Sequence, residues 1–570
     1  MWGGLSAKAQ DSLRLRYFFG ALEPPKSIGS FIEKNAFADS AQAHLIAGQV
    51  VQKLQDASYL DASCDSLVFA APQIYLYFSL GAPFFWASLS PGNLAPLLQS
   101  KISFKPKQWQ NRPFEFSEFQ RLADALVRYS ETQGYPFATV RLDSFQVSGQ
   151  QISGAIQYQS GPLIAFDTLQ IAGNVKIKPA FLSTFLRIRK DKPFDQNRLN
   201  QVAMSLRRLP FLRLVQPVSV KFQAGKAYPQ ILLMPQKSGQ VDGILGVLPN
   251  QERPNEVLLT GEFNLQLNNL FQTGKIFKAQ WQRLRPESQL LQIEYEHPCL
   301  FRTNLDLQFK FYLLREDSSF LNLDRRLDLL YALPNATRVG LFASYKQSTA
   351  GTSAQTVRTA TILPPFADTE VLMYGLTYEK KDLDDFFFPK KGKNIRFDIG
   401  IGNRNVLKNP LLSDSLYRDV ILSSPQVNLT ILYQQYWRLS RRSIFTMRAM
   451  GGYIFNNSLF LNDLFRLGGL NNLRGHNQNQ FFASGYGIAT IEYRFFIEQE
   501  TYFYLFYDQA LLQRQVLQNL TQDTPLGFGV GLSFSVKAGI LNFVYALGQS
   551  NEQSISFDRS KIHFGIVSRF

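Results

Sequence analysis

The residue types that most often carry chemistry are few in this chain and widely separated. Cys64 and Cys299 lie far apart and predict neither a metal cluster nor a disulfide framework. The histidines show no metal-ligand spacing and occupy positions His44, His297, His476 and His563. No G-x-S-x-G motif and no phosphate-binding glycine loop occurs. These patterns argue against an enzyme and predict no metal and no cofactor.

One acidic run leaves two interpretations open. Residues 382–385 read Asp-Leu-Asp-Asp, and carboxylates are the ligands that Ca²⁺ prefers. Phe386–Phe388 and a lysine-rich turn follow directly, which favours a solvated loop over a calcium site. The turn Pro389–Gly392 then leads into a candidate strand at Asn394.

The most informative run is Gly468–His476, Gly-Gly-Leu-Asn-Asn-Leu-Arg-Gly-His, which carries Arg474 on a glycine-rich turn. Two alternating strands follow it, before the chain ends at Phe570 on the apolar face of the last strand. An arginine on such a turn can donate several hydrogen bonds to carboxylates. Its meaning depends on the elements around it.

Composition indicates several domains and an apolar exterior. The 570 residues exceed one ordinary domain, and 60 Lys and Arg against 44 Asp and Glu give a net charge of +16. Aromatic residues make up 14% of the chain, and charged residues only 18%. No basic run with interleaved aromatics predicts nucleic-acid binding, so anionic lipid head groups are the favoured counterpart of the positive charge.

A transmembrane helix is not favoured. The longest uncharged stretch, Ser66–Ser90, is interrupted by Pro72, Gly81 and Pro83. A closed β-barrel is the other structure that satisfies every backbone group in lipid. At the N-terminus, Ala7-Lys8-Ala9 has the form of a signal-peptidase site, so residues 1–10 are predicted as a signal-peptide remnant, with an ordinary polar tail as the alternative.

The N-terminal half contains an internal repeat. Residues 112–115, Arg-Pro-Phe-Glu, match residues 192–195, Lys-Pro-Phe-Asp, at an offset of 80. Apolar residues at helical spacing follow each match and include Phe119, Leu126 and Leu206. A weaker copy precedes them, with a helix near 41–55. We therefore predict three α+β modules, at 11–80 (weak), 81–160 and 161–238. Their sheet edges could accept an extended peptide, or the modules could be rigid spacers.

From about Val241 the pattern changes to strict alternation. Leu305–Phe311, Ile395–Ile401 and Leu526–Val536 each alternate apolar with polar or small residues. Residues 239–570 are therefore predicted as a transmembrane β-barrel, and ~20 residues per strand and connection gives about sixteen antiparallel strands. A soluble β-sandwich would also alternate, but it would need a second core-forming pattern.

Modules followed by such a barrel and an Arg-Gly loop resemble the BamA/TamA superfamily of outer-membrane assembly proteins. Leu473-Arg474-Gly475-His476 matches the Val-Arg-Gly-Phe/Tyr motif on the sixth extracellular loop of that family. The resemblance implies periplasmic POTRA modules and a barrel in the outer membrane. Three modules make the chain more similar to TamA than to BamA.

The resemblance also implies partners for Arg474, because in the family this loop folds into the barrel and its arginine meets acids on the inner wall. Glu492 and Asp508 match the acidic positions of the two following strands, and alternation places both toward the lumen. His476 stands where the family has Phe or Tyr, which puts the packing role of this position in doubt.

In the family, the first and last strands meet at a weak lateral seam. Gly243 and Gly246 lie in the candidate first strand, and Gly565 and Phe570 lie in the last. Glycine weakens a strand ladder, although these glycines could equally serve barrel curvature.

The resemblance implies a protein that assembles, inserts or translocates outer-membrane clients. Its expected partners are unfolded outer-membrane proteins, periplasmic or inner-membrane accessory subunits and outer-membrane lipids. The alternative is a two-partner-type secretion pore that exports a soluble substrate. A passive porin would need neither the modules nor the loop.

Overall fold

The structure of the protein, a computed structural model, describes residues 13–20, 23–249, 257–285, 288–316, 319–351, 362–536 and 539–569. The predicted signal-peptide remnant and Phe570 lie outside these residues. Within the described ranges, no helix is both long enough and apolar enough to cross a membrane.

The chain divides into two compact units. Unit 1 comprises Met1–Phe166, Asp191–Asn197 and Phe222–Ala227. Unit 2 comprises Asp167–Lys190, Arg198–Lys221 and Tyr228–Phe570. Residues 161–238, predicted as one module, are thus shared between the units.

The first sheet of unit 1 belongs to the weakest sequence repeat. Its strands run in the order β2-β1-β4-β3, with β1 and β4 parallel. Asp39 caps α2 by accepting a hydrogen bond from the backbone N–H of Gln42, at 2.7 Å. This helix buries an apolar stripe that includes Ile46, Val50 and Leu54. The elements are β1 (Leu13–Phe18), α1 (Lys26–Lys34), β2 (Phe37–Ala38), α2 (Ser40–Asp56), β3 (Ser63–Ala70) and β4 (Gln73–Ser79).

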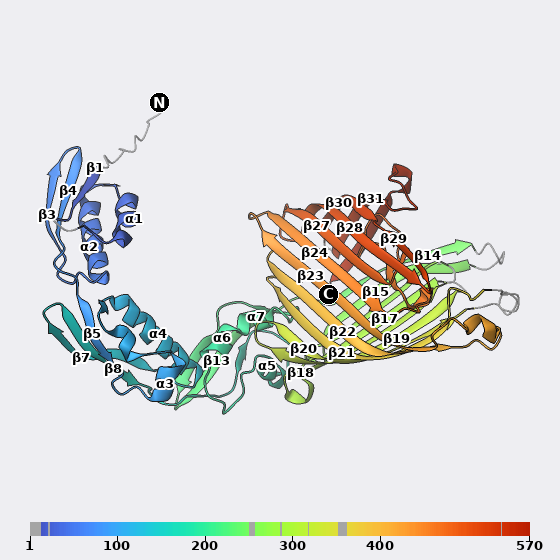
Figure 1. Cartoon of the computed structure of the whole chain (residues 1–570), viewed down its shortest axis with the longest axis horizontal. Coiled ribbons are helices and arrows are strands. Elements are labelled where there is room, and N and C mark those ends of the chain that lie inside the picture. The colour runs from blue at the N-terminus through green and yellow to red at the C-terminus, as the bar shows by residue number, and fades with distance from the viewer. Residues whose placement is uncertain are drawn as a thin grey trace. The chain divides into compact units, whose positions relative to one another are not determined.

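The second sheet repeats this topology, with the order β6-β5-β8-β7 and β5 parallel to β8. Figure 1 shows β5, β7 and β8 of this sheet together with α3 and α4. Its helix α4 buries Phe119 and Leu126, as the helical period predicts. The elements are β5 (Phe85–Ser90), α3 (Pro96–Lys101), η1 (Pro106–Trp109), β6 (Arg112–Pro113), α4 (Phe116–Thr132), β7 (Thr139–Ser148) and β8 (Gln151–Gln159). The shared strand order supports the predicted duplication.

The third sheet is centred on β13, which pairs in parallel with β9 and β10 and antiparallel with β11. The helix expected after residue 195 is split at Gln201 into α6 and α7, yet Leu199, Val202 and Leu206 are all buried as its period predicts. The elements are β9 (Ala165–Phe166), β10 (Gln170–Ala172), α5 (Pro179–Phe185), α6 (Gln196–Asn200), α7 (Val202–Leu206), β11 (Leu212–Leu214), β12 (Ser219–Gln223) and β13 (Lys226–Pro235).

Most of unit 2 is a closed antiparallel barrel that runs from β14 to β32. Two of its segments, β29 and β30, both pair with β28 and together form one interrupted strand, so the described residues build sixteen barrel strands. The segments are β14 (Gln240–Pro249), β15 (Val257–Leu270), β16 (Lys275–Arg285), β17 (Ser288–His297), β18 (Leu305–Glu316), β19 (Phe320–Leu333), β20 (Thr337–Ala350), β21 (Asp368–Leu383), β22 (Gly392–Leu407), β23 (Ser423–Arg438), β24 (Ser443–Phe455), β27 (Gly485–Phe496), β28 (Tyr502–Val516), β29 (Asn519–Asp523), β30 (Leu526–Val536), β31 (Gly539–Gln549) and β32 (Lys561–Arg569).

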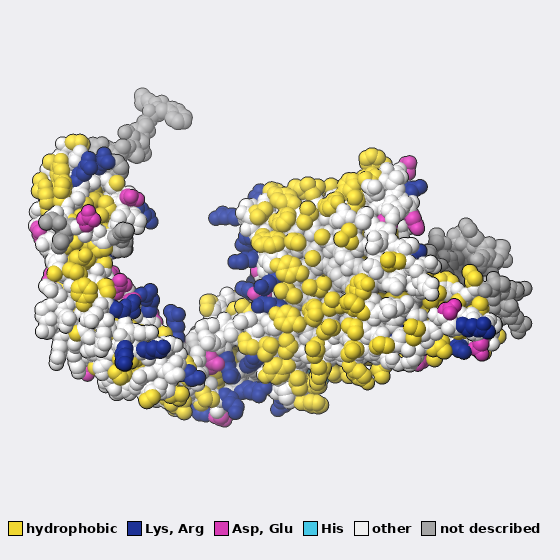
Figure 2. Space-filling view, viewed as in Figure 1, with side chains coloured by type: hydrophobic (Ala, Val, Ile, Leu, Met, Phe, Trp, Pro, Cys, Tyr) yellow, Lys and Arg dark blue, Asp and Glu magenta, His cyan; other side chains and the backbone are white. Residues whose placement is uncertain are grey.

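The two faces of the barrel wall differ as alternation predicts. Large apolar side chains are exposed on the outside, such as Leu341 at 62% and Ile401 at 63%. Figure 2 shows hydrophobic side chains gathered over the outer face of the barrel strands. Polar and charged side chains, including Asp398 and Thr377, are buried on the opposite face. An exterior of this kind is suited to lipid.

The connection between β24 and β27, residues 456–484, is hereafter the inner loop. It contains η4 (Leu461–Asp463) and a small sheet made of β25 (Phe465–Leu467) and β26 (Phe481–Ala483). Leu473 and His476 are both fully buried in it. The other short helices lie in the barrel connections and are η2 (Leu300–Arg302), η3 (Asp414–Tyr417) and η5 (Phe557–Arg559).

Candidate functional site

The inner loop carries the Arg-Gly motif to the barrel wall. Its chain turns at glycines with positive φ, Gly468 at 113°, Gly469 at 97° and Gly475 at 85°. The side chain of Arg474 is only 6% exposed. Such burial of a guanidinium requires charged partners.

Two inward-facing carboxylates supply those partners. Arg474 donates from Nε to Asp508 Oδ2 at 2.8 Å and from Nη2 to Asp508 Oδ1 at 2.7 Å. Its Nη1 donates to Glu492 Oε2 at 3.0 Å. The backbone N–H of Arg474 donates to Asp508 as well, at 3.1 Å. The structure therefore brings together all three residues that the sequence and the resemblance associated. We call Arg474, Glu492 and Asp508 the loop lock.

Neighbouring groups fix the geometry of the loop lock. The guanidinium carbon of Arg474 lies 3.6 Å from the centroid of the Phe506 ring, which permits a cation–π contact. Arg494 forms an ion pair with Glu492, so that this carboxylate lies between two cations. Bidentate, charge-assisted hydrogen bonds of this kind are among the strong ones in proteins.

Two glycines of the barrel wall allow the loop backbone to approach. A Cβ on Gly527 would lie 1.9 Å from the carbonyl oxygen of Arg474. A Cβ on Gly548 would lie 2.5 Å from the carbonyl oxygen of Gly475. In the sequence, Gly527 is recognisable only as a small residue on an alternating strand, and nothing distinguishes Gly548. Their role becomes visible only once the loop is in place.

His476 packs in the position where the family has an aromatic residue. It is 0% exposed, and its ring meets that of Phe481 edge-on, with centroids 4.9 Å apart. Its Nε2 lies 3.0 Å from the carbonyl oxygen of Leu526. The imidazole thus fills the aromatic site and adds a hydrogen bond to the wall.

A second set of contacts holds the beginning of the inner loop, and the sequence analysis missed it. Arg404, which is 0% exposed, donates from Nη2 to Asp463 Oδ2 at 2.6 Å. Thr369 donates its hydroxyl to Asp463 Oδ1 at 2.9 Å, and Lys346 donates to the backbone carbonyl of Asp463 at 3.0 Å. We call these residues the second anchor. The wall residues of the second anchor lie on β20–β22, whereas the two carboxylates of the loop lock lie on β27 and β28. The inner loop is therefore tied to two separate parts of the wall.

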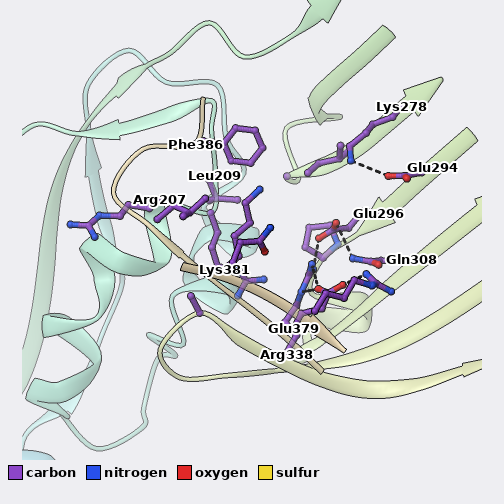
Figure 3. Close-up of a pocket in the computed structure, with 18 of the residues that line it drawn as sticks. Arg207, Leu209, Lys278, Glu294, Glu296, Gln308, Arg338, Glu379, Lys381 and Phe386 are labelled. Carbon is purple, nitrogen blue, oxygen red and sulfur yellow. Dashed lines mark hydrogen bonds and ion pairs between the residues drawn. The ribbon is translucent and has the colours of Figure 1, made fainter. Parts of the chain in front are cut away.

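Charged side chains also cover the inner wall between β17 and β22. Arg338 donates from Nη1 to Glu296 and from Nη2 to Glu379, each at 2.6 Å. Figure 3 shows these three side chains beside one another. Arg208 follows α7, and its Nη2 lies 3.4 Å from Asp306 Oδ2. We call the set the inner-wall ladder; it comprises Glu296, Asp306, Arg326, Asp328, Arg338, Glu379, Arg396 and Asp398.

A cavity of about 300 Å³ lies beside the inner-wall ladder. Arg207 and Leu209 line it from the third module, and Lys381 and Phe386 line it from the end of β21 and the following turn (Figure 3). The cavity therefore lies where the segment that follows α7 meets the barrel wall, within unit 2.

The acidic run at residues 382–385 stabilises the turn that follows it, through side-chain hydrogen bonds to backbone N–H groups. Asp384 Oδ1 accepts hydrogen bonds from the backbone N–H groups of Lys390 and Lys391, at 2.8 and 3.0 Å. Asp385 Oδ1 accepts from those of Phe387 and Phe388, both at 2.8 Å. Among the residues described, no group of three or more His, Cys, Asp and Glu could hold a metal. The turn is not fully solvated, because Phe388 is only 8% exposed.

The predicted seam lies between β14 and β32. Their register consists of Gln240 opposite Arg569 and Val241 opposite Ser568. By contrast, β21 and β22 pair along their whole length, from Asp368 opposite Leu407 to Leu383 opposite Gly392.

The predicted seam glycines take different environments. Gly243 and Gly246 lie opposite Phe263 and Thr260 of β15. A Cβ on Gly243 would lie 2.8 Å from a backbone oxygen, whereas one on Gly565 would meet nothing within 4 Å. Close packing thus accounts for glycine at Gly243 and does not account for it at Gly565.

Comparison with known proteins extends these observations. Residues 269–570 match the Omp85 superfamily domain. The fold is similar to that of CdiB from Escherichia coli, with a TM-score of 0.55, 12% identity, and coverage of 96% of this chain and 99% of that chain. For CdiB from Acinetobacter baumannii the TM-score is 0.53 at 13% identity, with 85% and 89% covered. BamA from Haemophilus ducreyi lacking POTRA domains 1–3 gives 0.40 at 13% identity, with 85% and 100% covered. Comparison with curated protein sequences gives no match.

The matched domain spans more than half of the chain and includes the inner loop and all barrel strands from β16 onward. Members of this superfamily are non-enzymatic assembly or transport proteins. The barrel lies in the outer membrane and the modules lie in the periplasm, so the protein acts in the assembly or translocation of proteins there. The chain belongs to the Omp85 superfamily.

Proposed function

We propose that this protein inserts client β-strands into the outer membrane through the seam between β14 and β32. The observation that carries the proposal is the short register of this pair, from Gln240 opposite Arg569 to Val241 opposite Ser568. Unpaired backbone groups on a strand edge bind another strand readily. Parting the seam exposes two such edges at the cost of few hydrogen bonds.

The modules receive the client before it reaches the barrel. In unit 1, β3 and β7 are edge strands of their sheets and can accept an extended peptide as an added strand. Exposed apolar side chains on β7, Phe145 at 49% and Val147 at 54%, offer contacts for the apolar residues of an unfolded barrel protein. Accessory subunits in the periplasm or inner membrane would bind to these modules, and outer-membrane lipids to the barrel exterior.

The inner loop keeps the lumen closed while the seam works. The loop lock and the second anchor fasten it to β27, β28 and β20–β22. Insertion through the seam leaves these contacts in place and requires no covalent step. A secretion pore of the two-partner type is the rival function, and it requires the inner loop to leave the lumen so that a soluble chain can pass.

A disulfide across the seam tests the proposal. Val241→Cys with Ser568→Cys places the two thiols on directly opposed residues, a geometry that antiparallel strands permit. The native Cys64 and Cys299 are first changed to Ser. Burial raises the pKa of Cys299 to about 12, so this thiol would react slowly in any case.

The matched control is Leu329→Cys with Leu341→Cys, an opposed and exposed pair within the long register of β19 and β20. We expect oxidation of the seam pair, but not of the control pair, to stop the assembly of other barrels in cells, and reduction to restore it. If the seam pair forms and assembly continues while export of a soluble substrate stops, the secretion-pore function replaces this proposal.

A further inference from the structure

The last described residue of β32 is fastened by its side chain as well as by strand pairing. Arg569 Nη2 donates to Glu500 Oε2 at 2.5 Å, and the Arg569 side chain is only 15% exposed. Glu500 lies in the β27–β28 connection and also accepts a hydrogen bond from the hydroxyl of Ser535, at 3.1 Å. The acceptor is therefore held on a different part of the barrel from β14.

Two aromatic rings complete the contacts of Arg569. Its guanidinium carbon lies 5.2 Å from the ring centroid of Phe387 and 5.3 Å from that of Phe388. Both distances fall within the range of a cation–π contact. Arg569 thus combines a carboxylate with two ring faces.

The turn that carries these rings is built to hold them still. As described above, the carboxylates of Asp384 and Asp385 accept backbone N–H groups on both sides of the turn. The ring of Phe388 packs in a buried cluster with residues from four other elements, Tyr436, Ile444, Phe496 and Ile540. The rings therefore present a fixed surface to β32.

Backbone pairing around Arg569 is sparse. In the described part of the chain, the register between β31 and β32 ends with Ile540 opposite Val567. Beyond it, Ser568 and Arg569 pair only with β14, and those two pairs are the whole described register of the seam. Any contact that fixes the side chain of Arg569 therefore contributes directly to seam closure.

We propose that Glu500, Phe387 and Phe388 form a latch that positions Arg569, and with it the end of β32, against β14. The seam parts when Arg569 leaves these three residues. The inference deepens the proposed function, because it names what keeps the seam closed. The latch can be measured in the purified protein alone, because it requires no client.

The test measures how fast the seam disulfide forms in the purified full-length protein, which carries Val241→Cys, Ser568→Cys and serine at both native cysteines. Arg569→Ala and Glu500→Gln are each added to this background. We expect the cross-linking rate to fall by up to roughly tenfold, which corresponds to loss of a partly exposed ion pair together with a cation–π contact. The Leu329→Cys, Leu341→Cys pair should cross-link at an unchanged rate in every background.

Further variants separate a latch from a general loss of structure. Arg569→Glu combined with Glu500→Arg restores the ion pair with its charges exchanged, and should recover part of the rate. Phe387→Leu should slow the rate without touching the ion pair. Heat-modifiable migration on gels verifies that each variant is a folded barrel.

Unchanged seam cross-linking in folded Arg569→Ala would overturn the latch, whatever happens to client assembly. Slower seam cross-linking without rescue by the exchanged pair would overturn the part assigned to Glu500. Slower cross-linking that the exchange rescues would support the latch even if barrel assembly in cells continued with the seam pair oxidised, which is the separate result that would contradict insertion through the seam.

Discussion

The inner loop and the seam are held in opposite ways. The loop is fixed at two places by buried ion pairs, with Arg474 between Asp508 and Glu492 and with Arg404 on Asp463. The described register of the seam has two opposed pairs, and the ion pair at the end of β32 joins Arg569 to Glu500, whose side chain is 38% exposed. Strong contacts therefore hold the inner loop to the wall, and the described contacts that hold the seam are weaker.

The contrast shows where this barrel can open at low cost. Removing one partner of a buried ion pair lowers the free energy of unfolding by ~3–5 kcal/mol, whereas an exposed ion pair contributes ~0–1 kcal/mol to it. Barrels otherwise have no free edge, which makes a short register between two neighbouring strands a local exception. The comparison favours movement at the seam over movement of the loop.

The largest effect is expected from Asp508→Asn. Asp508 is 0% exposed and accepts three hydrogen bonds from Arg474, so the substitution removes the charge of one of the two carboxylates that pair with this buried guanidinium, and the other, Glu492, is shared with Arg494. We expect destabilisation of the folded barrel by ~3–5 kcal/mol. Thermal midpoints from heat-modifiable gel migration measure the change, and protease cleavage within the inner loop reports its release.

Asp414→Asn is the matched control, since the Asp414 side chain is 84% exposed and pairs only at the surface with Lys408. Its midpoint should stay unchanged. If Asp508→Asn and Asp414→Asn had equal thermal midpoints, the buried ion pair of the loop lock would be no stronger than an ion pair at the surface.

Gly527→Ala should release the loop without altering any charge. The added methyl would lie 1.9 Å from the carbonyl oxygen of Arg474, which forces the loop or the strand to move. We expect a cost of ~1–3 kcal/mol, the range for overpacking a close contact. Gly487→Ala is the control, because a Cβ there meets nothing within 4 Å. Protease cleavage of the loop that increases equally in both variants would contradict the close approach.

Asp463→Asn should weaken the second anchor by less than Asp508→Asn weakens the loop lock. The amide keeps one carbonyl for Arg404 or Thr369, and the backbone contact with Lys346 remains. We expect a loss of ~1.5–3 kcal/mol, the range for a hydrogen bond to a charged group. The double variant with Asp508→Asn measures coupling between the anchors, and strict additivity would show that they act independently.

His476→Phe should have the smallest effect. The ring would keep its edge-on contact with Phe481 but lose the polar contact with the carbonyl oxygen of Leu526. We expect a change of about 1 kcal/mol or less, because a neutral hydrogen bond contributes ~0.5–1.5 kcal/mol and better apolar packing offsets it. A loss as large as that of Asp508→Asn would mean that the imidazole belongs to the loop lock.

Sequence analysis could predict what depends on local period. Alternation predicted the strand Leu526–Val536, which is β30, and it placed Glu492 and Asp508 on the inward face of their strands. The glycine-rich run had already singled out Arg474, and the resemblance implied that these two acids are its partners. Together they led to the loop lock, because a period of two determines the face of every residue in a strand.

Features that depend on register or on irregular chain could not be predicted in this way. Arg338 meets Glu296 across 42 positions of sequence, a pairing that follows from the register of several strands. Asp463 lies in a loop without periodicity, so nothing in its neighbourhood indicates Arg404. The latch depends likewise on a turn, at Phe387, that meets β32 only in the closed barrel.

The most direct test of insertion through the seam is site-specific photo-crosslinking to a defined client. A photoreactive residue replaces Val241 on β14 or, as the control, Leu341 on the lipid face of β20, while the cells produce a tagged eight-stranded outer-membrane barrel. We predict crosslinks to the tagged client from position 241 and none from position 341, and their loss when a cysteine pair locks the seam at Gln240 and Arg569, the other opposed pair. Crosslinks of equal strength from both positions, or none from 241 while the client still assembles, would contradict the account.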